Sequence, residues 1–402
     1  MKDVQYFTLL IATLRYKAMD AVGIEMDGLD ITNNITCEWS HNPSIDALKL
    51  RWRTLEKEAK PNLFISWCWI GPWLDTMVDD FWLLTACTNG QIVGLAIFTK
   101  KQKTNWLGQN YDHYFLHRLG NKDTDQIWIE YNDFLLESSQ AGQIREVMFQ
   151  AVQSRLQPRD CVSIGASSQV VMFRGAFEAD HARSMIPLTV WESPSYQVDL
   201  QLIQSQNQTA IESLSKSARK QIRRSIKKYE CCEPIKLETA KTCEQALVLF
   251  DKAKHNHLKR WGGERGQSGF ANPVFVQFHQ AFIRHNFSSG LINIHGFSVD
   301  DKDIGIIYNF HFKGVVYFYL SSLAYNDDPQ LKPGLVAHYL LIEQALKAGM
   351  KEYDFMGGEA RYKQTFANRQ HQLAIIEYHQ PHFALSLQNM ARGAKRLIVQ
   401  SS

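Results

Sequence analysis

The segment from residue 351 to residue 366 concentrates side chains that can transfer protons or neutralise charge. Asp354 alternates with two aromatic residues on a short apolar run that is predicted to be a buried strand, so its carboxyl group needs a partner or a proton. It is either a structural ligand of backbone groups, which we favour, or the base that accepts a proton from the attacking nucleophile. Glu359 is the alternative base. Lys363 can neutralise a phosphate or a carboxylate, and otherwise it is an ordinary exposed lysine.

Two glycine turns are expected to position these side chains. Residues 315–324 are aromatic and β-prone, and the chain then passes through Pro333 and Gly334 into a helix with apolar periodicity. A strand that opens into a helix leaves unpaired N–H groups and partial positive charge, which suit a pyrophosphate or another anion. A second short strand ends at a pair of glycines. That turn can aim Tyr362 and Lys363 into the cleft left by the first turn.

The strongest charge feature is the run KSARKQIRRSIKKYE at residues 216–230. At 100° per residue its apolar side chains fall on one side of a helix and its cations on a broad opposite face. That face carries Lys216, Arg219, Lys220, Arg223, Arg224, Lys227 and Lys228. It is either a solvated surface or a landing site for a phosphorylated donor, a tRNA acceptor end or an anionic lipid. No acidic side chain at i+4 spacing offsets the mutual repulsion, which favours a binding role.

Arg260 and Trp261 precede a pair of glycines and form a smaller candidate site. A guanidinium beside an indole suits substrate contact through stacking and hydrogen bonds. The alternative is a helix C-terminus with a packed tryptophan.

Other chemistries lack their residue patterns. His255 and His257 point to different faces of a helix, and no third zinc ligand lies nearby. His338 is predicted to be a core histidine. The motifs GxSxG, GKS/T and HExxH do not occur, which excludes serine hydrolase, P-loop and zincin chemistry. We therefore expect no metal.

Composition predicts a globular protein that is too long for one hydrophobic core. The 402 residues include 44 basic and 41 acidic ones, and a net charge of +3 gives no reason to expect a DNA partner. The seven cysteines are scattered, as expected for reduced thiols. No apolar run approaches the roughly 20 residues of a membrane span. We expect a cytoplasmic protein whose segment 383–399 is either a terminal docking helix or a peripheral membrane contact.

Helices, a β-hairpin and a strand–helix–strand order recur in the two halves of the chain. The first hairpin turns at Asn89-Gly90, a pair suited to a tight type I′ turn, and an aromatic helical segment before it is predicted to be interrupted at Pro72. The join lies near residues 192–212. The sequence therefore predicts two domains, residues 1–205 and residues 206–402.

The second half resembles a known family from about residue 214 to residue 370. It is similar to the acetyltransferase group of bacterial polysaccharide-biosynthesis clusters (the CelD-type group), which is related to the GNAT acyltransferases and the FemAB/FemX aminoacyl transferases. The resemblance is carried by the segments LSKSARKQIRRSIKKYE, RWGGERGQSGFANPVFVQFHQAF, YFYLSSLAYN, LKPGLVAHYLLIEQALKAGMKEYDF and MGGEARYKQTFA. LFISWCWIGPWL and IEYNDFLLES weakly resemble a degenerate first copy. An α/β fold of tandem GNAT-like domains is implied, with mixed central sheets flanked by helices and the second copy catalytic.

The resemblance also implies roles for single residues. In GNAT-type sites two strands splay apart, the donor lies in the opening, and backbone N–H groups polarise its carbonyl group. The corresponding positions here are Ser321, Ser322 and Leu323, and the donor pyrophosphate is expected near Lys332, Pro333, Gly334 and Leu335. Tyr362 stands where a tyrosine commonly protonates the leaving thiolate, and the alternative is a core aromatic residue on a short helix. The glycine-rich phosphate loop of the family is reduced here to Lys-Pro-Gly.

Acyl transfer by direct attack is the favoured function, from acyl-CoA (acetyl-CoA) to an amine or hydroxyl of a sugar or other cell-envelope precursor. One alternative keeps the fold and takes aminoacyl-tRNA as donor, with the cationic helix holding the acceptor stem. Another is a non-catalytic scaffold in exopolysaccharide biosynthesis. All enzymatic versions require that residues 320–325 and 353–356 separate instead of pairing along their whole length.

Overall fold

The structure is a computed structural model, and it describes residues 35–168, 185–231, 233–264, 266–300, 302–325 and 327–381. The described residues belong to one compact unit that begins at Ile35. The segment 383–399, with its predicted membrane contact, lies outside them. Within the described ranges, no helix combines the length and the apolar character needed to cross a bilayer. Cys37, Cys68, Cys87, Cys161 and Cys243 are free thiols.

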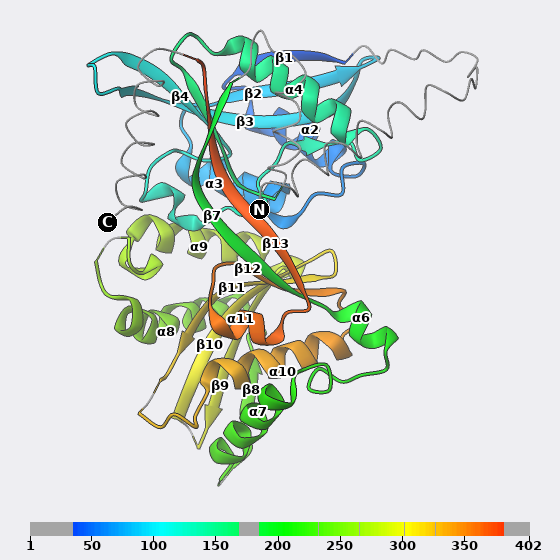
Figure 1. Cartoon of the computed structure of the whole chain (residues 1–402), viewed down its shortest axis with the longest axis vertical. Helices are drawn as coiled ribbons and strands as arrows, with labels where there is room; N and C mark the ends of the chain where they lie inside the picture. Colours follow the sequence, from blue (N-terminus) through cyan, green and yellow to red (C-terminus); the bar gives the residue numbers. More distant parts are fainter. Residues whose placement is uncertain are drawn as a thin grey trace, which may run out of the picture. The chain divides into compact units, whose positions relative to one another are not determined.

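The first half of the chain builds strands β1–β7 with the helices between them (Figure 1). The elements are β1 (Thr36–His41), α2 (Ile45–Leu55), η1 (Leu63–Ile65), α3 (Trp67–Met77), β2 (Trp82–Thr88), β3 (Gln91–Thr104), β4 (Asn110–Leu116), η2 (Thr124–Ile127), β5 (Leu135–Leu136), α4 (Ala141–Arg155), β6 (Cys161–Ser167), β7 (Ile186–Asp199) and α6 (Leu200–Ser205).

The second half begins with the cationic helix. Its elements are α7 (Lys216–Tyr229), β8 (Lys236–Thr239), α8 (Cys243–Trp261), η3 (Gly269–Ala271), α9 (Pro273–Asn286), η4 (Phe287–Ser289), β9 (Ile292–Val299), β10 (Lys302–Phe312), β11 (Val315–Leu323), α10 (Pro333–Lys347), β12 (Glu352–Gly357), α11 (Arg361–Phe366) and β13 (Arg369–His379).

The predicted repeat is confirmed by strand pairing. In the first half β2, β3 and β4 form an antiparallel meander, α4 follows, and β6 pairs parallel to β4. In the second half β9, β10 and β11 form the meander, α10 follows, and β12 pairs parallel to β11. The β2–β3 turn has the predicted geometry, with φ of 49° at Asn89 and 78° at Gly90. The chain is therefore a tandem α/β fold with a mixed sheet.

Two long strands join the repeats, and each repeat contributes its last strand to the other. The sheet order is β1-β2-β3-β4-β6-β13-β7-β12-β11-β10-β9-β8. β13 from the second half pairs with β6 of the first, β7 from the first half pairs with β12 of the second, and β7 pairs antiparallel with β13. Figure 1 shows these two strands running side by side between the repeats. The predicted join at residues 192–212 thus lies partly inside β7, and the division into two domains stays a prediction.

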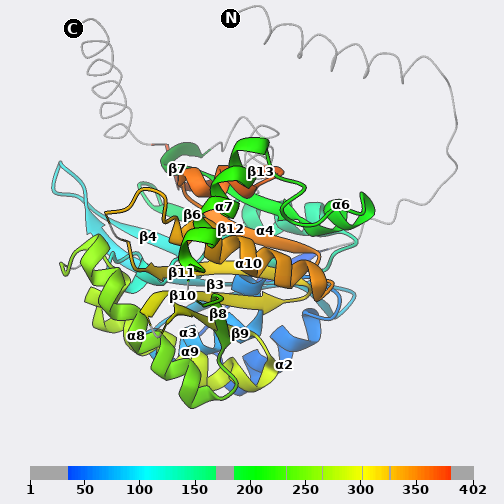
Figure 2. The same ribbon diagram turned by 90° about the horizontal axis from the view of Figure 1, so that it is seen from below.

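Helices cover both faces of the sheet (Figure 2). α2, α3, α8 and α9 enclose one hydrophobic core that draws on both halves of the chain. Trp69 of α3 is fully buried there, with its ring 5.2 Å from that of Phe278 and 5.0 Å from that of Phe282. On the other face, α4 covers the first repeat and α7, α10 and α11 cover the second. Burial of such large aromatic side chains contributes about 1.5–3 kcal/mol each.

The predicted interruption at Pro72 is wrong, because α3 continues through this residue to Met77. A proline inside a helix leaves the carbonyl four residues earlier without its usual donor. Here that carbonyl belongs to Cys68, and it accepts a hydrogen bond from Nδ2 of Asn286 on α9 at 3.1 Å. A side chain from the second half therefore compensates for a proline in the first.

Candidate active site

The two strands that must separate do separate. β11 and β12 pair over three positions only, from Val315 opposite Glu352 to Tyr317 opposite Asp354. Beyond this point β11 stays paired with β10 as far as Leu323. β12 stays paired with β7 on its other edge, from Glu352 opposite Asp199 to Gly357 opposite Ser195. The predicted opening between residues 320–325 and the end of β12 is confirmed.

Backbone amides of β11 face this opening. A β-bulge lies at its start, because Tyr308 and Asn309 of β10 oppose Leu320 and Phe318 and leave Tyr319 as the extra residue. Further on, the N–H of Ala324 donates to the carbonyl of Ile304.

Hydrogen-bonded and non-bonded pairs alternate along an antiparallel ladder. Because Ala324 is bonded to β10, the N–H groups of Ser321 and Leu323 point away from β10, toward the opening. Ser322 has the opposite parity, and its hydroxyl donates to the carbonyl of Ala253 on α8. At two of the three predicted carbonyl-binding positions, Ser321 and Leu323, the backbone N–H group therefore points into the opening, where it can donate to the carbonyl group of a bound acyl donor.

Helix α10 begins at Pro333, as predicted, beside the end of β11. A Cβ atom added at Gly334 would lie 3.4 Å from the side chain of Leu323 and 4.0 Å from the hydroxyl of Tyr325. The N–H of Lys332 donates to Oγ of Ser225 on α7 at 2.9 Å. The predicted phosphate-binding residues 332–335 and the cationic helix are thus neighbours in space.

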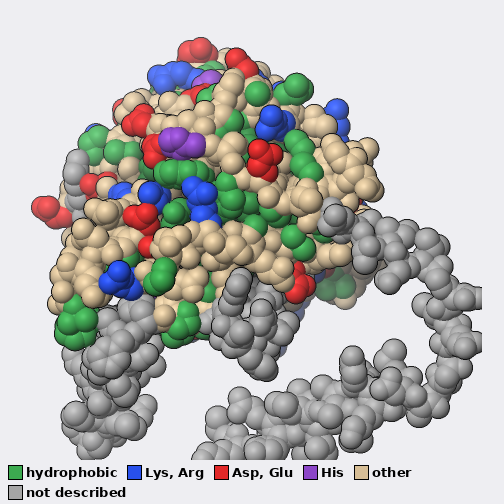
Figure 3. All heavy atoms as spheres, turned by 90° about the horizontal axis from the view of Figure 1, so that it is seen from above, with side chains coloured by type: hydrophobic (Ala, Val, Ile, Leu, Met, Phe, Trp, Pro, Cys, Tyr) green, Lys and Arg blue, Asp and Glu red, His purple; other side chains and the backbone are tan. Residues whose placement is uncertain are grey.

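Helix α7 has the predicted amphipathic form. Ser215 accepts a hydrogen bond from the N–H of Ala218 at 3.2 Å and begins the helix, and Ala218, Ile222 and Ser225 are buried. The six cations at 216, 220, 223, 224, 227 and 228 are exposed, and Arg219 is half-buried. Lys228 forms an ion pair with Asp328 in the loop before α10. By contrast, the face drawn in Figure 3 carries basic and acidic side chains interspersed.

Arg260 lies at the mouth of the opening. Its guanidinium stands 4.3 Å from the ring centroid of Tyr325 and 5.1 Å from that of Trp261. α8 ends at Trp261 with Gly262 as its C-cap, as the alternative expects, but Trp261 is 52% exposed and is not packed in the core. Arg260 is also close enough to Tyr362 for its charge to oppose the rise in the pKa of that phenol.

Tyr362 stacks on the buried His338, with ring centroids 5.0 Å apart and planes 8° from parallel. Burial raises the pKa of Tyr362, so the phenol keeps its proton. Burial lowers the pKa of His338 to about 3, and its Nδ1 lies 3.1 Å from the hydroxyl of Tyr353. His338 is therefore a neutral core histidine, as predicted, and it holds the ring of Tyr362 in place.

Lys363 is buried, at 7% exposure, and is not an ordinary surface lysine. Its Nζ donates to the carbonyl of Gly357 at 2.5 Å and to that of Met356 at 3.4 Å. Burial lowers its pKa, and the nearby charges of Glu130 and Asp354 oppose that change. The ammonium group thus fixes the turn after β12.

Glu130, which sequence reasoning missed, completes this site. A cavity of about 260 Å³ lies at the opening, and Glu130 and Lys363 both line it. Oε2 of Glu130 accepts a hydrogen bond from the N–H of Gly357 at 2.7 Å. Burial raises the pKa of its carboxyl group above the ordinary 4.5. A carboxylate of raised pKa beside a cavity is a good candidate for a general base.

Asp354 is held by structural contacts. Its Oδ1 accepts hydrogen bonds from the hydroxyl of Tyr131 at 2.9 Å and from the N–H of Met356 at 2.7 Å. The side chain is 2% exposed and does not line the cavity. This placement favours the structural alternative. Glu359 is exposed and also lies outside the cavity lining.

Asp354 has a consequence for stability. Burial raises its pKa from 3.8 to about 7. The folded carboxyl group therefore keeps its proton to a higher pH than the unfolded one. The contribution of Asp354 to stability is thus fully present below about pH 4 and is lost as the pH rises through about 7. We expect Asp354→Asn to be more stable than the wild type at pH 8, by at most roughly 4 kcal/mol, and equally stable at pH 4.

Denaturant unfolding of both proteins at several pH values measures this difference. Asp251→Asn on the exposed face of α8 is the control, with no expected change. An equal loss of stability in Asp354→Asn at both ends of the pH range would contradict the argument, since it would mean that the contacts require a charged carboxylate.

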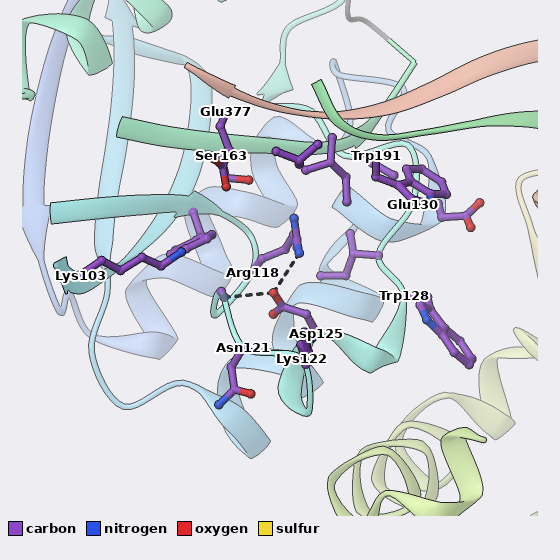
Figure 4. A pocket seen from close by; sticks show the side chains of 16 residues that line it. Lys103, Arg118, Asn121, Lys122, Asp125, Trp128, Glu130, Ser163, Trp191 and Glu377 are labelled. Carbon is purple, nitrogen blue, oxygen red and sulfur yellow. Dashed lines mark hydrogen bonds and ion pairs between the residues drawn. The ribbon is translucent and has the colours of Figure 1, made fainter. Parts of the chain in front are cut away.

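A second cavity, of about 620 Å³, adjoins the first (Figure 4). Trp128, Glu130 and Trp191 line both. The second cavity lies where β4 and β6 of the first repeat separate, since these strands pair only from His113 opposite Cys161 to Phe115 opposite Ser163. Each repeat therefore has an opening between its parallel strands, and the two openings meet at Glu130.

Strained backbone gathers around this meeting point. Trp128, Tyr131 and Met356 have φ of 47°, 52° and 58°, a region that L residues with large side chains seldom adopt. Such strain, on the order of 1–3 kcal/mol each, persists where the surrounding contacts impose it, commonly at functional sites. No group of three His, Cys, Asp or Glu side chains suited to a metal ion occurs in the part of the chain that the structure describes.

Comparison with known proteins agrees with this geometry. Residues 216–364 match the family model described as an acetyltransferase (GNAT) domain. No curated protein matches the chain by sequence. Among solved structures, FemX is similar over 88% of this chain and 99% of its own, with a TM-score of 0.52 and 8% identity.

Two further structures are similar over most of the chain. The C-terminal domain of a putative lysylphosphatidylglycerol synthetase from Agrobacterium fabrum has a TM-score of 0.49 and 9% identity, and covers 87% of this chain and 96% of its own. A tandem GNAT protein from the clavulanic acid biosynthesis pathway has a TM-score of 0.44 and 11% identity, and covers 87% and 100%. The chain has the GNAT fold, and its residues 216–364 are similar to GNAT-type acetyltransferase domains.

Proposed function

We propose that the protein transfers an acyl group from acyl-CoA to an amine or hydroxyl at the opening between β11 and β12. The observation that carries this proposal is the cavity at that opening, which Glu130, Lys363 and the β11 residues Phe318 and Tyr319 line, with the outward-facing amides of Ser321 and Leu323 further along β11. An acyl transferase needs this combination of a base for the nucleophile and donors for the developing oxyanion.

The donor's phosphates are proposed to bind at the start of α10. Unpaired N–H groups at a helix N-terminus attract anions, and Lys332, Pro333, Gly334 and Leu335 form the first turn and its approach. Arg260 lies over Tyr325 on one side and α7 lies against the loop on the other. The pantetheine arm then runs along β11, past Ser321 and Leu323.

In the proposed reaction Glu130 removes a proton from the acceptor, and the acceptor's lone pair attacks the thioester carbonyl carbon. The amides of β11 stabilise the oxyanion of the tetrahedral intermediate. As it collapses the C–S bond breaks, and the thiolate takes a proton from Tyr362, which solvent restores. Asp354 supports this site through Tyr131 and the Met356 N–H without touching the substrate.

Aminoacyl-tRNA is a second candidate donor, and one observation favours it. The exposed cations of α7 form a broad strip beside the loop before α10, more charge than a single pyrophosphate needs. If this strip binds an acceptor stem, affinity falls steeply with added salt, because each neutralised phosphate releases counterions. The similarity to FemX is in fold only.

The acceptor and setting are further proposals. A sugar or other envelope precursor in the cytoplasm, as in the CelD-type polysaccharide-biosynthesis group, suits the family that the second half resembles. Trp261 and Lys363 are proposed to contribute to the substrate site with Arg260. A scaffold without catalysis is the competing explanation.

Thermal shifts test the donor directly. Purified protein is incubated with acetyl-CoA, with longer acyl-CoAs and with charged tRNA, since a ligand at 100 times its Kd adds about 2.7 kcal/mol of stability. A shift with an acyl-CoA, lost in a Gly334→Trp variant that blocks the start of α10, supports the proposal. A shift only with tRNA supports the second donor, and no shift with any of them favours the scaffold.

We expect Tyr362→Phe to lower the transfer rate at least about tenfold and to leave acetyl-CoA affinity within about twofold. The phenyl ring still stacks on His338, so only the proton donor is lost. Thiol release measures the rate and calorimetry the affinity. Unchanged turnover in this variant would remove Tyr362 from the mechanism, and Tyr339→Phe on α10 is the matched control.

A further inference from the structure

The opening of the first repeat faces the catalytic opening of the second, and its lining has the chemistry of a ligand site. Its volume of about 620 Å³ is within the range of small-molecule pockets. Because Glu130 lines both cavities, a molecule held in the first can present one of its groups to Glu130 in the second.

Two half-exposed tryptophans flank this passage. Trp128 is 40% exposed and Trp191 is 39% exposed, and both line both cavities. In Figure 4 they lie with Glu130 at one end of the larger cavity, opposite Lys103. A large aromatic ring that is exposed to water lacks the favourable free energy of burial. A ligand that covers such a ring in a concave site supplies it, so these rings suit contact with a ligand.

The ring of Trp128 is fixed. Its centroid lies 5.6 Å from that of Phe275 and 6.2 Å from that of Tyr319, and its backbone is held at a φ of 47°. A fixed aromatic face offers a flat apolar surface at little cost in conformational entropy. The backbone strain at this residue is consistent with a functional position.

The polar lining is balanced in charge. It comprises three basic side chains (Lys103, Arg118 and Lys122) and three acidic ones (Asp125, Glu130 and Glu377), with Asn121 and Ser163. Some of these cations and carboxylates are already engaged with each other, as in the pair of Arg118 Nη2 and Asp125 Oδ2 at 3.1 Å. Such interleaved donors and acceptors suit hydroxyl groups better than a polyanion.

We propose that the opening between β4 and β6 binds the acceptor, and that this acceptor is a neutral sugar whose ring stacks on Trp128 and Trp191 with a hydroxyl or amino group directed at Glu130. The proposal rests on the acyl-transfer function proposed above. A pyranose has an apolar face of C–H groups and a rim of hydroxyls, which matches aromatic faces at one end of the cavity and mixed polar groups at the other.

A glycan array carrying neutral and acidic sugars tests this, probed with the wild type, Trp128→Ala and Trp191→Ala. Trp106→Ala is the control, because Trp106 is 60% exposed in the β3–β4 turn and lines neither cavity. We expect neutral glycans to bind the wild type and Trp106→Ala, and binding to fall at least tenfold in Trp191→Ala. Because Trp128 also packs against Phe275 and Tyr319, Trp191→Ala is the decisive variant if Trp128→Ala does not fold.

Exclusive binding of acidic glycans, no glycan binding, or equal binding by Trp191→Ala would each overturn the proposal. Thiol release from acetyl-CoA with hydroxylamine as a surrogate nucleophile is measured in parallel, because it does not need the acceptor site. We expect the wild type to show this release and Trp106→Ala, whose side chain lines neither cavity, to retain it within about twofold. If the wild type lacks it, acetyl transfer fails as the function, whereas the glycan result still decides the sugar site independently.

Discussion

Replacing Glu130 by glutamine is expected to lower kcat/KM by about 10²- to 10⁴-fold, the usual contribution of a positioned general base. The variant should remain folded, because the glutamine oxygen can still accept the hydrogen bond from the Gly357 N–H. Acceptor-dependent thiol release measures the rate, and near-ultraviolet circular dichroism checks the fold. Glu146→Gln, on the exposed face of α4, is the matched control.

The pH dependence gives a second readout of the same variant. A general base works when ionised, and burial raises the pKa of Glu130 above 4.5. Activity should therefore be full above that raised pKa and fall as the pH drops through it. In Glu130→Gln the residual activity should no longer fall as the pH drops through this range. If the same fall in activity at low pH persists in this variant, another titrating group, such as the acceptor amine itself, causes it.

Two further variants separate Glu130 from its rival. Glu359→Gln tests the base expected from sequence, and its side chain is exposed outside the cavity. Gly357→Ala places a Cβ atom 3.1 Å from Oε1 of Glu130 and should displace the carboxylate without removing it. We expect Gly357→Ala to lose activity and Glu359→Gln to keep it. The reverse pattern would return the role of base to Glu359.

Separating the chain at the predicted domain boundary is expected to abolish folding of the second half. Residues 206–402 alone lack β7, which lies between β13 and β12 and pairs with both. Without β7 these two strands lose their shared partner and expose unpaired backbone groups and apolar side chains. We expect insoluble or molten protein, judged by solubility and by cooperativity of thermal unfolding.

Co-expression of residues 1–205 with residues 206–402 should restore a soluble complex, because it supplies β7 as part of a second chain. The intact chain with a cleavable linker inserted after Gln206, between α6 and α7, is the control and should fold normally. Cooperative unfolding of residues 206–402 as a monomer would show that β7 is dispensable and that the predicted boundary delimits an independent domain.

Local patterns predicted the elements well. Asn89-Gly90 marks its hairpin, the apolar stripe of residues 216–230 marks α7, and Pro333 begins α10. β7 and β13 were missed because their pairing joins residues about 180 positions apart, from Gln197 opposite Arg369 onward. No local signal encodes such a partner. The helix at Pro72 was misread for the same reason, since its compensating donor comes from α9.

The sequence predicted only those site residues that come from the second half of the chain. Tyr362 and Lys363 follow a recognisable turn, and the structure places them near the opening. Glu130, Trp128 and Trp191 come from the first repeat. Glu130 lies within the segment IEYNDFLLES, whose weak resemblance to the family assigned no role to any single residue. Glu130 stands 227 positions from Gly357, and its raised pKa arises from burial between the repeats. Only the fold brings these residues together.

The reciprocal placement of β7 and β13 bears on how such a protein can originate. A single ancestral repeat could build this sheet only as a symmetric pair of chains that exchanged their last strands. In that pair both openings would carry identical side chains, so a substitution that improved one would alter the other equally. Fusion into one continuous chain removes this constraint and lets natural selection specialise each opening separately.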